Sequence, residues 1–387
     1  LPVASLGLDR AQRFRLAMET MPATREARVA MAEGLGAAAR RLGVRLVVGE
    51  ITDAGSGRPG HPGPELRDAP AAVTRPAPPG ALDPPPAVPD PVARVERPGL
   101  PGARTVPDLA PDRYGTPLQR ADGTRTPLFT GEPTREQTEL GALGDHALIS
   151  VFGGVAGHRP ELIRDVVRET GDGDYEVRLH ETTYSPRGHR TDPTGRRVSL
   201  TVTPDLPVFA DAPERPAFAA VAGAAWPAIL EKAFAGIEQT WGAERRAALG
   251  DGGGYPRIGR DNGLREQVEM LTLLTGLPAK VWKFSGDSLR SSPTADRRLL
   301  NRFRELLRAR NPIFVSTRDR YETEPPLVKD LMDHYGYEIT LVDARGLFHL
   351  RSPWNGTHPE PLTIDELRAN VLHYYLTFAD PIDRGGM

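Results

Sequence analysis

The segment from Gly141 to Ile149 places a histidine where the start of a helix can influence its chemistry. Gly141 and Gly144 allow a tight backbone, and Asp145 is a favourable residue to cap a helix that we predict over residues 145–152. His146 then lies at the positive end of the helix dipole, where a thiol would have a lowered pKa. An imidazole at this position is biased to its neutral form, which can bind a metal.

Two alternative chemistries would use His146. A metal site could add Asp333, His334 or Tyr335, but the sequence has no His-x-x-x-His or Glu-x-x-His spacing, so we predict no metal. Ser352 could be a nucleophile with His146 as its base. However, no G-x-S-x-G motif surrounds Ser352, and it follows a predicted strand instead of opening a helix.

Composition excludes several classes of site. The 387 residues include no cysteine, which excludes disulfides, Cys-ligated zinc, iron–sulfur clusters and a thiol nucleophile. The 49 basic residues balance 51 acidic ones, so we expect neither nucleic acid nor an anionic membrane as a partner. No apolar run approaches the roughly 18 residues of a membrane span, and no signal-peptide pattern opens the chain. These observations leave the compartment open.

Proline divides the N-terminal part of the chain. Residues 59–111 contain 16 of the 39 prolines. Each proline removes a backbone donor and fixes φ, so we predict a Pro-rich linker over 57–111 in which no helix or sheet ladder forms. Residues 1–56 are too few for an independent core and are predicted to be a small, mainly helical docking segment.

The remaining chain is predicted to be α+β in two lobes, over 112–212 and 213–380, followed by a tail at 381–387. Periodicity predicts helices at 145–152, 159–169, 226–240, 264–275 and 295–308. It predicts strands at 175–181, 197–202, 313–317, 337–343 and 346–351. In the charged helix 295–308, Leu299, Leu300, Phe303, Leu306 and Leu307 are expected to pack inward.

Five sequence motifs, in order, resemble the calpain-type cysteine protease core, which belongs to the papain-like proteases. The nucleophile signature of that family reads Gln-Gly-x-x-Gly-Asp-Cys-Trp-Leu-Leu, and residues 140–149 are similar to it. The other motifs are Trp226-Pro227-Ala228-Ile229-Leu230-Glu231-Lys232-Ala233-Phe234-Ala235, Gly254-Tyr255 with Gly263 and Leu271–Gly276, Tyr335–Ile339, and Leu350-Arg351-Ser352-Pro353-Trp354-Asn355. The resemblance spans about residues 135–376 and implies a two-lobed calpain-like fold of the bacterial branch.

The same resemblance implies that the catalytic set is absent. The family's oxyanion glutamine corresponds to Leu140, its cysteine to His146, its histidine to Tyr335 and its orienting asparagine to Ser352. A one-residue shift would place His334 at the histidine position. Thiol proteolysis needs a nucleophile, a base, an orienting group and an oxyanion donor acting together, so we expect a pseudoprotease that is not an enzyme.

A pseudoprotease retains the cleft between its lobes, and we expect it to bind a protein partner or another part of the same polypeptide. Binding candidates beside the degenerate positions are Asp145, Ala147, His334, Tyr337 and Trp354. The resemblance implies, as context, a larger bacterial secreted or toxin-like assembly. No cofactor is expected; Asp251 and Asp261 leave calcium as an alternative, since acidic loops of calpain cores bind it. Two alternative functions remain. One is an enzyme of another class with a rebuilt site at His146, Tyr335 and Ser352, and the other is residual hydrolysis of the calpain-family type.

Overall fold

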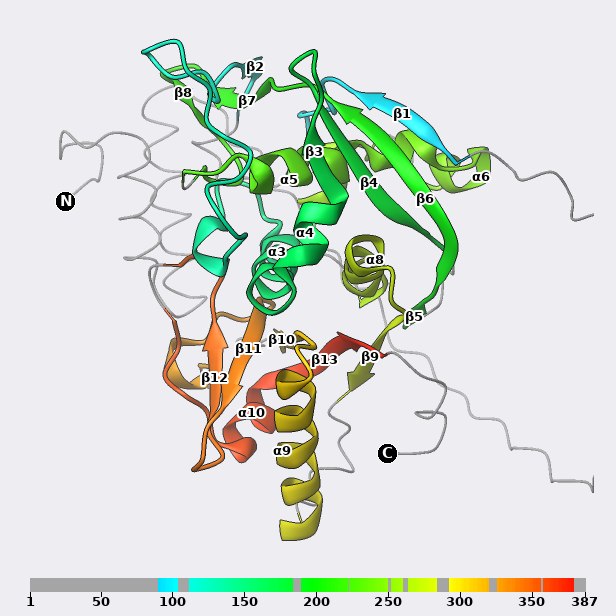
Figure 1. The fold of residues 1–387 in the computed structure, drawn as a ribbon. Helices are drawn as coiled ribbons and strands as arrows, with labels where there is room; N and C mark the ends of the chain where they lie inside the picture. The colour runs from blue at the N-terminus through cyan, green and yellow to red at the C-terminus, as the bar shows by residue number, and fades with distance from the viewer. Residues whose placement is uncertain are drawn as a thin grey trace, which may run out of the picture. The chain divides into compact units, whose positions relative to one another are not determined.

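Helices and sheets are interspersed along the chain in an α+β arrangement (Figure 1). The computed structural model describes residues 90–103, 111–183, 189–221, 223–249, 252–259, 264–283, 292–319, 326–355 and 358–378. The predicted docking segment 1–56, the tail 381–387 and most of the predicted linker 57–111 lie outside these residues. Among the described helices, none has the length and apolar character needed to cross a membrane.

The first sheet has the strand order β1-β6-β4-β3. Its strands are β1 (Val92–Val95), β3 (Val167–Glu169), β4 (Tyr175–Thr182) and β6 (Pro193–Val202). β1 pairs with β6 in parallel, whereas the other pairs are antiparallel. The prediction that no ladder forms within 57–111 is therefore wrong for β1. No proline occurs between Pro91 and Pro98, so the backbone donors of this short stretch remain available for pairing.

The second sheet is antiparallel, with the order β12-β11-β10-β13-β9-β5. Its strands are β5 (Arg190–Thr191), β9 (Ala279–Lys283), β10 (Ile313–Thr317), β11 (Gly336–Val342), β12 (Phe348–Arg351) and β13 (Val371–Thr377). β10, β11 and β12 confirm the three strands predicted in this region. Tyr335 directly precedes β11, and Ser352 directly follows β12.

The third sheet, β2-β7-β8, crosses the predicted boundary between the lobes. It consists of β2 (Arg113–Gly115), β7 (Leu206–Phe209) and β8 (Ala212–Pro216), paired antiparallel. The predicted boundary between residues 212 and 213 falls inside β8. This predicted boundary is therefore misplaced, because the residues before and after it belong to the same sheet through the β7–β8 hairpin.

Helix α3 (His146–His158) packs against α5 (Trp226–Gly236) and α8 (Leu264–Thr275), and all three helices contact strands of the sheets. The other helical elements are η3 (Arg135–Gln137), α4 (Pro160–Val166), η4 (Ile237–Thr240), α6 (Ala243–Ala247), α7 (Tyr255–Ile258), α9 (Pro293–Arg308), η6 (Val328–Asp330) and α10 (Ile364–Asn370). The helix predicted over 159–169 ends at Val166, and its last residues form β3 instead. Val167 is β-branched, and its pairing with Val177 of β4 decides its conformation.

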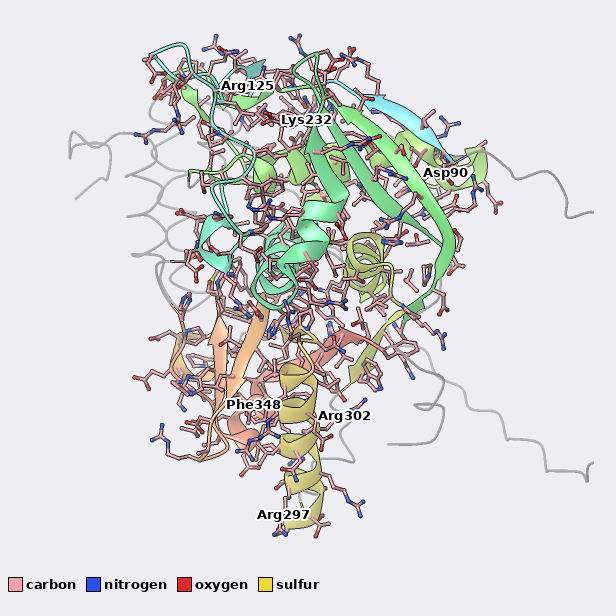
Figure 2. The ribbon with its side chains drawn as sticks, in the orientation of Figure 1. Asp90, Arg125, Lys232, Arg297, Arg302 and Phe348 are labelled. Atoms are coloured by element: carbon pink, nitrogen blue, oxygen red, sulfur yellow. The ribbon has the colours of Figure 1, made fainter. Side chains whose placement is uncertain are left out.

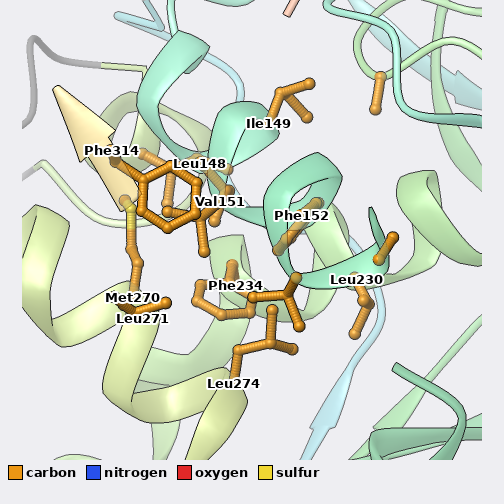
Figure 3. Close-up of a cluster of buried hydrophobic side chains, with 14 of the residues drawn as sticks. Leu148, Ile149, Val151, Phe152, Leu230, Phe234, Met270, Leu271, Leu274 and Phe314 are labelled. Atoms are coloured by element: carbon orange, nitrogen blue, oxygen red, sulfur yellow. The ribbon is translucent and has the colours of Figure 1, made fainter. Parts of the chain in front are cut away.

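The core is centred on α3, whose residues 146–156 are all buried. A helix that is apolar around its whole circumference must be enclosed by other elements. Figure 3 shows how this happens: Leu148, Val151 and Phe152 of α3 face side chains from α5, α8 and β10. A Cβ atom on Gly154 would lie 2.5 Å from the Phe314 ring, so glycine is needed for this close approach.

Helix α9 has the two faces that its sequence predicts. Phe303 and Leu306 are buried, and Leu299, Leu300 and Leu307 pack against the core. The ring of Phe303 meets that of Phe348 on β12, with 5.8 Å between ring centroids. Figure 2 shows the charged side chains of α9, among which Arg297 is exposed.

Candidate functional site

Asp145 occupies the N-cap position of α3, as predicted, but its side chain makes no capping hydrogen bond. The side chain is 1% exposed and faces Glu231 of α5, which is also 1% exposed. Burial raises the pKa of Asp145 to about 7. Asp145 therefore lies at the predicted place but faces the interior, which rules it out as a surface binding residue in this conformation.

His146 is the first residue of α3 and is 9% exposed. Its Nδ1 atom accepts a hydrogen bond from the backbone N–H of Gly336 at 3.2 Å. An N–H group can only donate, so Nδ1 carries no proton and the ring proton belongs on Nε2. Its ring centroid lies 4.5 Å from that of Tyr335. The first residue of α3 and the start of β11 thus meet directly.

Tyr335, and not His334, lies beside His146. Tyr335 is 5% exposed, and its hydroxyl faces Ser352 and Trp354. Burial raises the pKa of this hydroxyl well above its ordinary value. His334 has a φ of 49°, and its half-exposed ring places Nδ1 2.5 Å from Oδ1 of Asp319. Because of the turn at His334, its side chain is half-exposed beside Asp319, whereas the side chain of Tyr335 is buried.

Ser352 and Leu140 complete the group. Ser352 is 5% exposed, and its Oγ accepts a hydrogen bond from the backbone N–H of Trp354 at 3.3 Å. The backbone N–H of Leu140, also 5% exposed, donates to the carbonyl of Pro353 at 3.1 Å. The structure therefore brings Leu140, His146, Tyr335 and Ser352 together from separate parts of the chain.

His358 is a neighbour to which the sequence interpretation gave no role. Its Nδ1 accepts a hydrogen bond from the backbone N–H of Ser352 at 3.3 Å, and the residue is exposed. In the sequence, His358 is simply the histidine six positions after Ser352, and no known motif has a spacing that would predict this contact.

Two further binding candidates belong to the interior. Ala147 is fully buried in α3. Tyr337 is 2% exposed, and its hydroxyl oxygen accepts a hydrogen bond from the backbone N–H of Met332 at 3.0 Å. A partner needs accessible surface, which neither residue has in this conformation, so contact with a partner stays a prediction for both. His334 and the partly buried Trp354 remain accessible.

A polar network that sequence reasoning missed holds the loop before α3. Glu338 of β11 is fully buried, and its carboxylate lies 2.8 Å from Nη2 of Arg135 and 3.3 Å from Nε2 of His158. Burial alone would raise the pKa of Glu338, but hydrogen bonds from His158 and Arg135 lower it below its ordinary value. Nδ2 of Asn355 donates to the carbonyl of Thr138 at 2.6 Å. These contacts attach residues 135–138 to β11 and to the turn after β12.

No cation site is evident within the described ranges, where no three His, Asp or Glu side chains are placed to share a metal ion. Asp251 and Asp261, the calcium alternative, lie outside the described residues. A cavity of about 520 Å³ is lined by residues 97–103, 111, 112 and 114, and by none of the four site positions.

The arrangement supplies hydroxyl, imidazole and apolar groups in a closed setting, without a thiol. Neither a scan against protein-family models nor a search of curated proteins finds a match for this chain. The geometry of the residues themselves is therefore the basis for a functional proposal.

Proposed function

We propose that this chain is a catalytically inactive, calpain-like pseudoprotease with a binding or scaffolding role. One observation carries the proposal. Leu140, His146, Tyr335 and Ser352, which correspond to the family's four catalytic positions, converge around the first residue of α3. Four residues from distant segments would not be expected to meet if the sequence correspondence were accidental.

The chemistry of these residues supports the loss of proteolysis. A cysteine protease needs a thiolate, an imidazole that exchanges its proton, and an oxyanion donor. His146 occupies the nucleophile position, and Leu140 supplies no side-chain donor. The Tyr335 hydroxyl, with its raised pKa, is a poor base at neutral pH.

The proposed binding role uses a protein partner or another part of the same polypeptide, within a larger bacterial secreted or toxin-like assembly. The four converging positions are at most 9% exposed, so they are unsuited to direct contact with an extended peptide. His334, whose side chain is 51% exposed, and the partly buried Trp354 are the binding candidates that a partner could reach.

A turnover assay tests the proposal. The full chain is incubated with unfolded casein, with and without calcium, alongside a His146→Ala variant, and new peptide ends are counted. We expect no cleavage by either protein. Cleavage that disappears in His146→Ala would overturn the proposal in favour of a rebuilt or residual hydrolase at this site. Cleavage that is equal in both proteins would overturn it in favour of a catalytic site elsewhere.

A further inference from the structure

Two carboxyl groups face each other in the interior, at the junction of α3 and α5. Asp145 and Glu231 are each 1% exposed. Among the described residues, neither forms an ion pair. Burying two acids without a cation is costly unless one or both are neutral.

The hydrogen bonds around the pair require a proton. Oε2 of Glu231 accepts the backbone N–H of Ala219 at 2.9 Å. Neither oxygen of Asp145, nor Oε1 of Glu231, accepts a hydrogen bond from an N–H or O–H group of another described residue. Two ionised carboxylates can only accept hydrogen bonds and repel each other. Their contact is favourable when a carboxyl proton of one is donated to the other.

The groups packed around the pair do not neutralise it. Lys232 follows Glu231 in sequence, but its Nζ donates to Thr203 and Asp205 instead. Among the described residues, Tyr255 interacts electrostatically with both acids, Tyr114 with Glu231 and Tyr335 with Asp145. The charges acting on the neighbouring Lys232 are Asp205, Arg97 and Asp174, and His146 follows Asp145 at the start of α3. Burial, together with the charge of Asp145, raises the pKa of Glu231 well above its ordinary value.

The pair lies beside the connection between two segments, one of which leads into α3. The backbone N–H of Ala142 donates to the carbonyl of Ala217, and that of Ala220 donates to the carbonyl of Glu139, each at 3.0 Å. Glu231 holds Ala219 between these two bonds. Ionisation of both acids would therefore place two like charges directly beneath the connection between segments 139–142 and 217–220.

We propose that Asp145 and Glu231 form a proton-dependent latch: protonated, the pair holds segments 139–142 and 217–220 against the start of α3, and its deprotonation loosens them. The latch does not depend on the proposed pseudoprotease function. Loosening would increase solvent access to Leu140 and to the first turn of α3. The structure as described corresponds to the protonated, closed state.

The direction of the pH dependence follows from the raised pKa values. Because the folded state holds protons that the unfolded state releases near pH 4, stability from this pair is fully present at acid pH. It is lost as the pH rises through the pKa of Asp145, at about 7. Each proton held only by the folded state raises the unfolding equilibrium constant by up to about tenfold per pH unit.

Unfolding of the full chain by urea, measured between pH 5 and 8, tests the latch. The measured quantity is the slope of log10 of the unfolding constant plotted against pH. We expect Asp145→Asn and Glu231→Gln each to reduce this slope by up to about one log unit per pH unit. Either variant suffices if the other fails to fold. The matched control is Glu269→Gln, which removes a buried carboxylate held by Arg245 at 2.6 Å and should keep the wild-type slope.

Hydrogen exchange gives a local measurement of the same latch. In the wild type, the amides of Ala142, Ala219 and Ala220 should lose protection between pH 6 and 8, after correction for intrinsic exchange, and Glu231→Gln should remove that loss. A wild-type slope in both variants, or protection that is unchanged across this pH range, would overturn the proposal. The casein assay is independent of both results.

Discussion

The side chains at the start of α3 are packed into the interior. His146 accepts a backbone hydrogen bond from Gly336 and lies against the ring of Tyr335, and both side chains are nearly enclosed. A nucleophile–base pair needs instead an accessible atom and a group free to exchange a proton. At this scale, Leu140, His146, Tyr335 and Ser352 are buried side chains, and the contacts of His146 connect α3 to the start of β11.

Away from the candidate site, the ammonium group of Lys232 is buried and held by several hydrogen bonds (Figure 2). Its Nζ donates to the carbonyl of Thr203 at 2.9 Å and to the carbonyl of Asp205 at 2.6 Å, and burial lowers its pKa to about 8. We predict that Lys232→Met destabilises the fold by about 3 kcal/mol, because Asp205 loses its buried partner. Urea unfolding at pH 7 measures the loss. In the control, Lys329→Met, which removes a partly exposed pair with Glu366, should cost at most about 1 kcal/mol. Equal losses in the two variants would contradict this account.

Elements with a strong local pattern could be predicted from the sequence, and those decided by distant pairing could not. The helix over Leu264–Thr275 and the strand over Ile313–Thr317 were predicted at the bounds that the structure gives. The strand Val167–Glu169 was missed because its pairing with β4 outweighs the helical pattern before it. For the candidate site, the four positions were predicted from motif order, but the contact of Asp145 with Glu231 depends on how α3 and α5 pack, which no local pattern encodes.

Gly141 lies in the loop that leads into α3, where it approaches the backbone of Phe218 closely. A Cβ atom there would lie 1.7 Å from the carbonyl oxygen of Phe218, which is backbone and cannot move alone. We predict that Gly141→Ala costs more than about 3 kcal/mol in stability, whereas Gly171→Ala, whose Cβ would meet nothing within 4 Å, changes stability by less than about 0.5 kcal/mol. Thermal unfolding of both variants measures the difference. Similar melting temperatures would show that the loop is not packed as described.

At the scale of the whole molecule, part of the predicted linker belongs to the folded body. Val95 of β1 is fully buried, and the carbonyl of Gly99 accepts the backbone N–H of Tyr255 at 3.0 Å. The proline count correctly marks a region poor in backbone donors, but it does not locate the short proline-free stretch that joins the sheet. The sequence interpretation placed the start of the body at residue 112. The structure places β1, which belongs to the body, before that residue.

Two truncations test where the body begins. We predict that removal of residues 1–111 lowers the melting temperature by about 5 °C or more relative to removal of residues 1–89, because only the longer deletion removes β1 and the burial of Val95. Differential scanning calorimetry of the two truncated chains gives the comparison, with the full chain as reference. Identical melting temperatures would mean that β1 adds nothing to the fold.

The central claim is that residues 140, 146, 335 and 352 form one former protease centre, and restoring its proton-exchanging pair tests it most directly. The chain contains no cysteine, so His146→Cys introduces a single thiol whose alkylation by iodoacetamide can be measured without background. The account predicts that the double variant His146→Cys/Tyr335→His is alkylated at pH 6 at least about tenfold faster than His146→Cys alone, because an adjacent imidazolium stabilises the thiolate. Equal rates in the two variants would contradict the claim that these positions form one catalytic centre.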